Sequence, residues 1–410
     1  MRISTSQIYS MNVAKTGDLQ SSLAKTQQQI SSGTSVLTPS DDPIASARAL
    51  QVKSAKAALT VQASNQGTAS DSLKTLDSSL SSVTDVLQYI RDRVLEAGNG
   101  SLSTSNLQSI ASDVQSQFSS LMSIANSKDA YGSYMFSGYK GDTQPFTGDI
   151  QDVTYNGDQG ERSLQVSSSR MMPVSLNGYE LFMNIPSANG VFSVNGSSNT
   201  AVISEGTVTG TVAYSGTQYG IKFTSASTYD VYDIGADPTM TATTSPPLLA
   251  SGVSYTSGST ITLPDPNNAS TAQISVSISG TPSSGDTFTA KPGDSTDMFS
   301  TIQEFVVGLT NTSGTSYTQM ISDTISRLDS ALANVSRLQS DVGSREVEVE
   351  ALTSLNSGTS LQYDSRINDL VGLDYASAIS TYQEQQTSLQ AALNTFSKIS
   401  GLSLFNYISG

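Results

Sequence analysis

The chain has 410 residues, with no cysteine, histidine or tryptophan, and only 13% of its residues are charged. The missing cysteine and histidine exclude zinc sites built from thiolates or imidazoles, disulfides, and catalytic triads that contain either residue. Thirty-five acidic against 20 basic residues give a net charge of −15, which opposes a phosphate backbone, so we expect no nucleic-acid partner.

The N-terminal segment carries a weak apolar stripe that predicts an amphipathic helix. Its expected subunit-interface side chains are Ile3, Ile8, Met11, Leu19, Leu23 and Ile30. The same segment lacks the apolar stretch of roughly 7–15 residues that a secretory signal peptide needs. No run of about 18 apolar residues occurs anywhere in the chain, so we expect no membrane insertion. The protein therefore stays inside the cell or leaves by a route that reads another signal.

The stretch SSGTSVLTPSDDP, residues 31–43, predicts a joint between two helices. Glycine suits the position after a helix, and serine or aspartate can cap the next helix, with proline in its first turn. The two aspartates would then face the positive end of the helix dipole. The alternative is a carboxylate pair for acid–base or metal chemistry, but it lacks a histidine and a third ligand. We assign joint and cap roles to Gly33, Pro39, Ser40, Asp41, Asp42 and Pro43.

No proline occurs between residues 44 and 144, so long helices are possible there. Seven aliphatic side chains alternate at steps of three and four residues, as in a coiled-coil seam: Leu73, Leu76, Leu80, Val83, Leu87, Ile90 and Val94. The stretch EAGNG, residues 96–100, ends this helix. A second stripe from Leu107 to Ile124 predicts a partner helix, so the two form an antiparallel hairpin.

The middle of the chain, 147–300, reads as one or two small β-rich domains. Asn-Gly pairs at 156–157, 177–178 and 195–196 predict hairpin turns, and GIKFT (220–224) and AQISVSIS (272–279) predict strands. Residues 141–300 carry 14 acidic and four basic side chains, so most of the negative charge lies here. Asp230 and Asp233 could contact a calcium ion, but the spacing of a calcium loop is missing, which favours an exposed acidic strand.

The last part of the chain has no proline after 292 and carries two more stripes. Ile321, Leu328 and Val335 belong to the first stripe, and the stretch LNSGTS, residues 355–360, is expected to end its helix. The final helix is expected to present Tyr375, Ala378, Tyr382, Leu389, Ala392, Phe396, Ile399, Leu404 and Phe405 to neighbouring subunits. An aromatic ligand site is the alternative for its tyrosine and phenylalanine side chains, but their spacing favours a helical seam.

Isolated amphipathic helices do not persist in water, because packing supplies most of their stability. We therefore expect the two extreme ends to be mobile in the monomer and to become ordered when many copies assemble. We find no arrangement that indicates a catalytic, cofactor-binding or metal residue, so we expect a protein that is not an enzyme and needs no cofactor.

Both ends resemble the flagellin superfamily and, within it, the proteins at the hook–filament junction of the bacterial flagellum. The matching stretches are MRISTSQIYS (1–10), QQQISSGTSVLTPSDDPIASARAL (27–50), YMFSGYKGDTQPF (134–146), DYASAISTYQEQQTSLQAAL (374–393) and LSLFNYI (402–408). They span about the first 146 and roughly the last 100 residues. One departure is Thr34 and Ser35, which stand where the family commonly has a basic pair.

The resemblance implies an α+β fold: an elongated antiparallel helical coiled-coil bundle from the N- and C-terminal segments, with an inserted β-rich domain. Residues 41–146 and 301–360 would form the helical rod, and 147–300 the outer domain. Residues 1–40 and 361–410 would be disordered in the monomer and form an axial tube on assembly.

The resemblance also implies a location and partners. The chain would leave the cell unfolded through the flagellar type III export channel and assemble outside as a ring of its own copies. The ring would lie between hook-associated protein 1 and the first flagellin subunits, after a cytoplasmic export chaperone had held the chain. A filament subunit is the nearest alternative, and a secreted adhesin or enzyme on a helical stalk is a more distant one.

Overall fold

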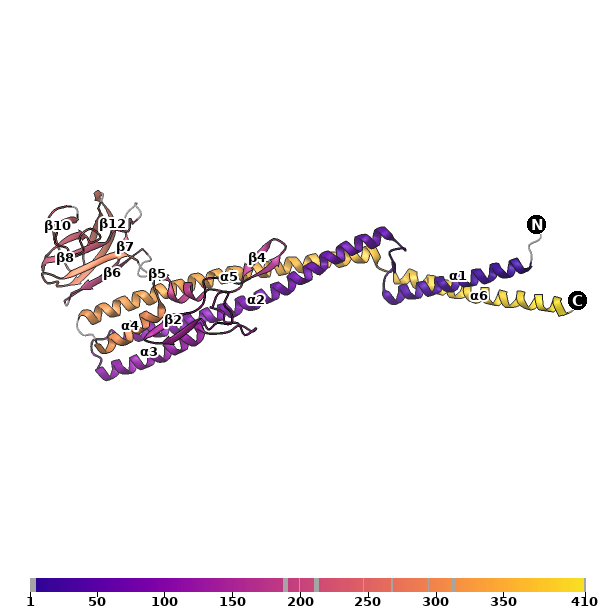
Figure 1. Cartoon of the computed structure of the whole chain (residues 1–410), viewed down its shortest axis with the longest axis horizontal. Helices are drawn as coiled ribbons and strands as arrows, with labels where there is room; N and C mark the ends of the chain where they lie inside the picture. The colour runs from indigo at the N-terminus through magenta and orange to yellow at the C-terminus, as the bar shows by residue number, and fades with distance from the viewer. Residues whose placement is uncertain are drawn as a thin grey trace. The chain divides into compact units, whose positions relative to one another are not determined.

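The structure is a computed structural model that describes residues 5–186, 191–198, 200–209, 214–245, 247–266, 268–293, 295–311 and 315–408. The chain divides into two compact units. A terminal unit consists of Met1–Gln66 and Ala351–Gly410, and a central unit consists of Gly67–Glu350. Long helices come from both ends of the sequence and antiparallel strands lie between them in the chain, which confirms the α+β class (Figure 1).

The terminal unit is helical. It contains α1 (Thr5–Ser32), α6 (Tyr375–Ile408), the first part of α2 (Pro43–Ala97) and the last part of α5 (Thr315–Val371). Helices α1 and α6 contact each other and run antiparallel, so both chain ends lie at the same end of this pair (Figure 1).

The predicted helix end at 355–360 is wrong, because α5 continues without a break to Val371. A single glycine inside a helix costs only about 1 kcal/mol, which the neighbouring turns can offset. The Asn356 side chain also does not compete with its own helix, since its Nδ2 donates to the backbone oxygen of Leu59 in α2 at 3.1 Å.

The helices of the central unit confirm the hairpin predicted from the heptads. The seven seam residues from Leu73 to Val94 are at most 1% exposed. After the turn at Gly98, α3 (Thr104–Ala125) begins at the N-cap Ser103, and Tyr89 donates back to Asp113 Oδ2 at 2.7 Å. The central part of α5 packs Leu328, Val335 and Val342 into the core and passes through Gly343 without interruption.

Small strands and an aromatic cluster join these helices. The strand pairs are β1 (Phe146–Asp149) with β2 (Asp152–Tyr155), β3 (Ser163–Ser167) with β4 (Arg170–Pro173), and β5 (Ile185–Pro186) with β14 (Ser295–Thr296). A π-helical turn, η1 (Tyr179–Met183), and α4 (Met298–Asn311) complete this region. Phe136, Phe146, Phe182 and Phe299 are at most 1% exposed and contact one another at ring distances of 5.2–5.7 Å.

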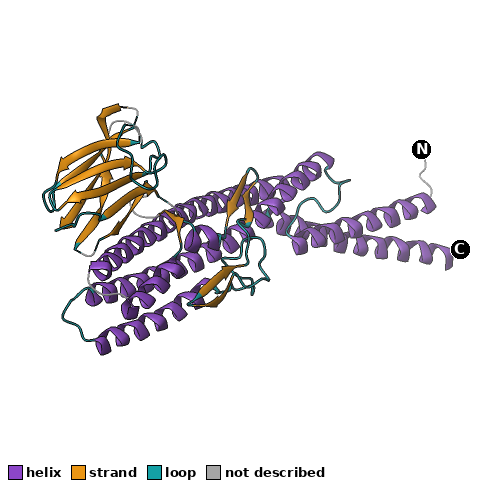
Figure 2. Ribbon diagram, turned by 60° about the vertical axis from the view of Figure 1, so that its left-hand side comes forward, coloured by secondary structure: helices purple, strands orange, loops and turns teal. Residues whose placement is uncertain are grey.

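The rest of the insert is a β-sandwich of two antiparallel sheets (Figure 2). One sheet has the order β10-β9-β8-β13-β6 and the other β11-β12-β7. Their bounds are β6 (Phe192–Ser197), β7 (Ala201–Val208), β8 (Tyr219–Ser225), β9 (Thr228–Asp233), β10 (Leu248–Ser254), β11 (Thr260–Asp265), β12 (Asn268–Gly280) and β13 (Thr287–Pro292). Phe223, Ile274 and Phe288 lie in its buried core. The strands predicted at 220–224 and 272–279 are confirmed.

The Asn-Gly pairs do not form hairpin turns, so that prediction is wrong. The first pair follows β2, the second opens η1, and the third lies inside β6. Two of these glycines are needed for close packing: a Cβ on Gly178 would lie 2.7 Å from the Phe136 oxygen, and one on Gly196 would lie 2.7 Å from the Phe288 ring. Glycine at these sites reflects tertiary contacts that a local turn pattern does not contain.

Candidate assembly interface

The joint after α1 depends on a glycine. Gly33 has a φ of +71°, and its N–H donates to the Gln29 oxygen at 2.9 Å, which closes the last turn of α1. A side chain there would be strained in this left-handed conformation, and its Cβ would come 2.8 Å from the Tyr375 hydroxyl. The residue that ends α1 is therefore also the place where the start of α6 approaches.

The chain passes from α1 to α2 at this joint, which we call the first crossing. A second crossing, from α5 to α6, lies beside it, and the sequence did not predict this. The Gly372 N–H donates to the Asn368 oxygen at 2.8 Å and ends α5. Thr34 and Gly372 form an antiparallel bridge. The Ser35 N–H donates to the Val371 oxygen at 2.9 Å, and the Leu373 N–H donates to the Gly33 oxygen at 3.2 Å. Backbone contacts thus join the two crossings, and Thr34 and Ser35 take part in them.

Both following helices begin at an aspartate cap. Asp42 Oδ1 accepts from the N–H groups of Ile44 at 3.0 Å and Ala45 at 2.9 Å, with Pro43 in the first turn of α2. Asp374 Oδ1 accepts from the Ala376 N–H at 3.0 Å at the start of α6. A glycine followed by a capping aspartate marks each crossing, and this signal could have located the second one.

The Asp41 carboxylate contacts the backbone of the loop and the side chain of Lys25 in α1. Its Oδ2 accepts from the N–H groups of Leu37 at 3.1 Å and Thr38 at 3.0 Å, while the Lys25 ammonium donates to Oδ1 at 2.6 Å. The hydrogen bond from Lys25 is the main cause that lowers the pKa of Asp41 to about 2. Pro39 and Ser40 are exposed on the same loop. The Asp41 and Asp42 carboxylates both accept from backbone N–H groups, and Asp41 also binds Lys25. Both carboxylates therefore have a structural role at this joint.

The predicted seam residues lie along the α1–α6 pair but are incompletely covered. Half-buried or buried members are Leu19, Leu23, Ile30, Ala378, Tyr382, Leu389, Ala392 and Phe396. The Phe396 ring lies 5.1 Å from that of Tyr9. Met11 and Tyr375 remain 62% and 51% exposed. Ile3 lies outside the described residues, as do the side chains of Ile8, Ile399, Leu404 and Phe405.

The terminal unit exposes an excess of large apolar side chains. Of the twenty in the described part of the chain, eleven belong to this smaller unit: Tyr9, Met11, Val13, Ile44, Leu50, Val61, Leu355, Leu361, Tyr375, Ile379 and Leu393. The unit also has eight basic and seven acidic side chains, so it is nearly neutral while the whole chain carries −15. A neutral, apolar-rich surface is suited to contact with other proteins.

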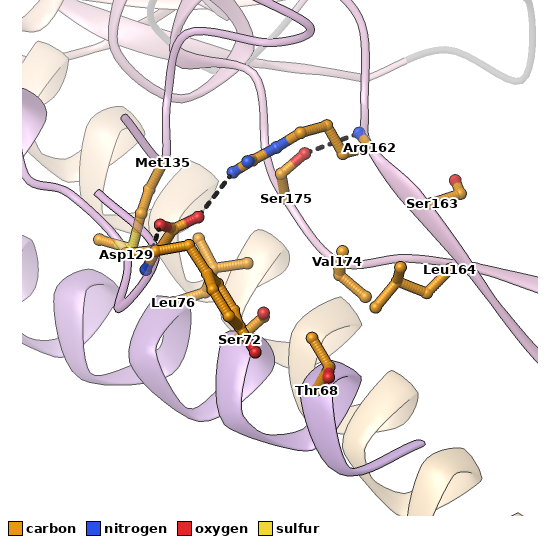
Figure 3. Close-up of a pocket in the computed structure, with 11 residues that line it drawn as sticks. Thr68, Ser72, Leu76, Asp129, Met135, Arg162, Ser163, Leu164, Val174 and Ser175 are labelled. Atoms are coloured by element: carbon orange, nitrogen blue, oxygen red, sulfur yellow. Dashed lines mark hydrogen bonds and ion pairs between the residues drawn. The ribbon is translucent and has the colours of Figure 1, made fainter. Parts of the chain in front are cut away.

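A pocket in the central unit offers the alternative of a ligand site (Figure 3). It has a volume of about 170 Å³ and is lined by α2, the loop at Asp129 and the β3–β4 region. Its charged groups already bind each other, since Arg162 Nη2 lies 3.2 Å from Asp129 Oδ2 and the Arg162 N–H donates to Ser175 Oγ at 2.8 Å. We interpret these contacts as structural links between the loop at Asp129 and the β3–β4 hairpin.

Other classes of site find no support in the described ranges. Within 5–408, apart from the gaps given above, no three acidic side chains group as a cation would require. Asp230 and Asp233 accept instead from the backbone N–H groups of Gly252 and Gly235. In the same ranges no helix is both long and apolar enough to cross a bilayer.

Comparison with known proteins identifies relatives of the whole chain. Residues 3–141 match the family described as the bacterial flagellin N-terminal helical region. The flagellar hook-associated protein 3 of Salmonella typhimurium is 27% identical over 405 residues, which are 99% of each chain. That of Escherichia coli is 26% identical over the same length.

Solved structures agree with these relatives. The flagellar hook associated protein-3 of Legionella pneumophila has a TM-score of 0.69 at 28% identity and covers 78% of this chain and 98% of its own. The flagellar junction protein FlgL from the same organism has a TM-score of 0.67 at 28% identity, over 79% of this chain and 100% of its own. These relatives are structural proteins of the flagellum, so the expectation that the chain is not an enzyme agrees with its homology.

Proposed function

We propose that this chain, which belongs with the flagellins and is homologous over its full length to flagellar hook-associated protein 3, joins the hook of the bacterial flagellum to its filament. The match over 99% of both chains carries the proposal, because it includes the insert as well as the two ends. The relatives named for this role are hook-associated and junction proteins, and a fold-level likeness alone would not support it.

The terminal unit would be the part that assembles. Its eleven exposed apolar side chains and its near-neutral charge suit burial against other copies. A fully buried leucine contributes about 1.5–3 kcal/mol, so covering Leu50, Leu355 and Leu361 in each copy would favour a ring substantially. In that ring α1 and α6 would form the axial tube, with hook-associated protein 1 on the hook side and flagellin on the filament side.

The proposal includes export through the flagellar type III channel, and the composition of the chain is compatible with that route. The chain has no cysteine, so no disulfide would prevent threading as an unfolded polypeptide. A cytoplasmic chaperone would hold the chain near its C-terminus until export, since the apolar side chains of α6 would otherwise associate prematurely. The protein would act outside the cell, at the hook–filament junction.

The experiment is a clean deletion of the gene with complementation by the full chain. Cells without the protein should release intact flagellin into the medium and carry hooks without filaments, and the full chain should restore filaments. Filaments that still grow from the hooks would exclude the junction role.

A filament subunit is the second candidate, because the N-terminal family match is shared with flagellins. It predicts a different result of the deletion, since released flagellin would then be missing or reduced. Electron microscopy with antibody against this chain gives the direct distinction: label confined to the junction supports our proposal, and label along the filament supports the subunit.

A further inference from the structure

Five Asn-Gly pairs occur in the chain, and the fold gives them different environments. Asparagine followed by glycine is chemically reactive, because the backbone nitrogen of the glycine can attack the side-chain carbonyl carbon without hindrance from a Cβ. The pairs that begin at Asn99, Asn156, Asn177 and Asn195 lie in the described part of the chain, and the pair at Asn189 lies outside it. Comparison of the four shows which pair the fold leaves able to react.

The pair at Asn177 is fixed by buried hydrogen bonds. Asn177 is only 8% exposed, and its Oδ1 accepts from the Glu180 N–H at 2.7 Å. The N–H of the following Gly178 donates to the Phe136 oxygen at 2.9 Å. The nitrogen that would attack and the carbonyl that it would attack are therefore both held in other contacts.

Two further pairs are restrained by their neighbours. The Asn156 Nδ2 donates to Thr147 Oγ1 at 2.9 Å, and the Tyr155 hydroxyl covers Gly157, since a Cβ there would lie 2.4 Å from it. Asn195 lies inside β6. In an extended strand each side chain projects out of the sheet, away from the N–H of the next residue. Neither pair is arranged for ring closure.

The pair Asn99-Gly100 differs from these three, because it lies in the exposed turn between α2 and α3. The Gly100 N–H donates to no group in the described ranges, and a Cβ on Gly100 would meet nothing within 4 Å. Asn99 Oδ1 accepts from the Ser101 N–H at 3.2 Å and from the Ser101 hydroxyl at 2.9 Å. Because this oxygen reaches the residue after the glycine, the Asn99 side chain folds back toward the Gly100 peptide group.

The two donors from Ser101 also suit the reaction itself. Attack on Asn99 Cγ would place negative charge on Oδ1, and hydrogen-bond donors already directed at that oxygen stabilise such charge. The exposure of the turn gives solvent access to the Gly100 N–H and lets a leaving group depart. The geometry of this turn therefore favours an intramolecular reaction that the other three pairs are not arranged to undergo.

We propose that Asn99 is a covalent modification site, at which the Gly100 nitrogen attacks Asn99 Cγ and closes a succinimide ring. Hydroxide removes the Gly100 proton, the Cγ–Nδ2 bond breaks, and the amide nitrogen takes a proton from water and departs as ammonia. Water then opens the ring at either carbonyl and leaves aspartate or isoaspartate. The net reaction consumes one water molecule, releases one ammonia and transfers no electrons. The inference does not depend on the junction role.

The products change the turn that joins α2 to α3. The Asn99 N–H donates to the Glu96 oxygen at 3.0 Å, and the Leu102 N–H donates to the Asn99 oxygen at 3.2 Å. Isoaspartate inserts a carbon atom into the backbone between these two hydrogen bonds. Either product also adds a negative charge near the C-terminal, negative end of the α2 dipole. We therefore expect faster hydrogen exchange at the Leu102 amide in the modified chain.

The test compares the folded full chain with the same chain in urea, both kept in mildly alkaline buffer. Tandem mass spectrometry of peptides prepared in acid measures conversion at each asparagine. In the folded chain Asn99 should convert at least tenfold faster than Asn156, Asn177 and Asn195, while in urea the four rates should agree within threefold. Folded chain in which Asn99 converts no faster than the other three would overturn the proposal. The same advantage for Asn99 in urea would show that the fold does not select it.

Two variants test the roles of the neighbouring residues. Gly100→Ala fits the open turn, but its methyl group hinders the attacking nitrogen, so conversion of Asn99 should slow at least tenfold. Ser101→Ala removes one of the two donors to Oδ1 and should slow conversion at least threefold. Ser105→Ala, at an exposed position in the first turn of α3, is the matched control and should leave the rate unchanged. All three should melt at the temperature of the parent chain. An unchanged rate in Gly100→Ala would exclude the succinimide route, and an unchanged rate in Ser101→Ala would exclude the part assigned to its hydroxyl.

Discussion

At the scale of single residues, the joint shows how local chemistry can be read from sequence. A glycine that must leave the right-handed region and an aspartate that must cap a helix are short-range requirements, so Gly33 and Asp42 could be assigned their positions without a structure. The bridge between Thr34 and Gly372 joins residues far apart in the chain. No local pattern contains this bridge, although the glycine and the capping aspartate at Gly372 and Asp374 could have located the end of α5 and the start of α6.

Asp41 gives the joint a predictable response to acid. Its pKa is lowered from 3.8 to about 2, chiefly by the hydrogen bond from Lys25, so its stabilising contribution is present above the unfolded value. That contribution is lost as the pH falls from about 4 through about 2. A carboxyl NMR titration should place the Asp41 midpoint near the lower value, with amide protection of Leu37 and Thr38 falling in the same range. In Lys25→Met the midpoint should move up toward the ordinary value, and an unmoved midpoint would contradict this account.

Gly138 and Gly343 should respond to alanine with opposite signs. Gly138 has a φ of +73°, and a Cβ there would lie 2.1 Å from Asp158 Oδ1, whose own pKa is lowered by the Tyr139 N–H. Gly138→Ala should therefore destabilise the central unit by about 2 kcal/mol or more. Gly343 lies inside α5, where an added methyl group would meet nothing within 4 Å, so Gly343→Ala should stabilise by about 0.5–1 kcal/mol. Urea unfolding of both variants measures the difference, and equal effects would show that the contacts at Gly138 do not matter.

At the scale of elements, periodicity predicted the helices better than turn motifs predicted the strands. The seam from Leu73 to Val94 repeats over several turns, so one unfavourable residue cannot change the outcome. Each Asn-Gly pair is a signal of only two residues. At Gly178 and Gly196 the packing against Phe146 and Phe288 overrides this local turn preference. In the same way, the long helical pattern of α5 overrides the short LNSGTS stretch, so the helix continues through it.

One contact between elements could not be foreseen at all. Gln319 of α5 is 7% exposed and binds the edge strand β7 as another strand would. Its Oε1 accepts from the Ile203 N–H at 3.2 Å, and its Nε2 donates to the Ile203 oxygen at 3.3 Å and to Asp323 Oδ1 at 2.7 Å. An edge strand is thereby covered at one residue, which limits pairing with other chains.

Gln319→Leu should leave both backbone groups of Ile203 unpaired at a cost of about 1–3 kcal/mol. We expect hydrogen exchange at the Ile203 amide to rise roughly tenfold or more, since the cost corresponds to one or two factors of ten. Thr318→Ala, at the exposed neighbouring position, is the control and should leave that amide unchanged. Unaltered exchange in Gln319→Leu would mean that β7 is held by its sheet alone.

At the scale of the whole molecule, the two units differ in how fully each one buries its apolar side chains. The central unit has its own buried seam, an aromatic cluster and the core of a β-sandwich. The terminal unit leaves its seam half-buried and exposes more large apolar side chains although it is the smaller unit. Composition alone predicted neutral ends and an acidic insert, but only the structure distinguishes a covered seam from an uncovered one.

Removal of residues 1–40 and 361–410 should therefore leave a folded, soluble core. Because the buried residues of the central unit are all retained, its thermal transition should move by no more than a few degrees, while the truncated chain fails to restore filaments in deleted cells. Calorimetry together with near-UV circular dichroism of the Tyr-containing core measures the first part, and complementation measures the second. The matched control is the full chain, which keeps both terminal helices and should restore filaments in the same cells. A truncated protein that loses its cooperative transition would show instead that α1 and α6 stabilise the monomer, and that assembly must begin from helices already formed.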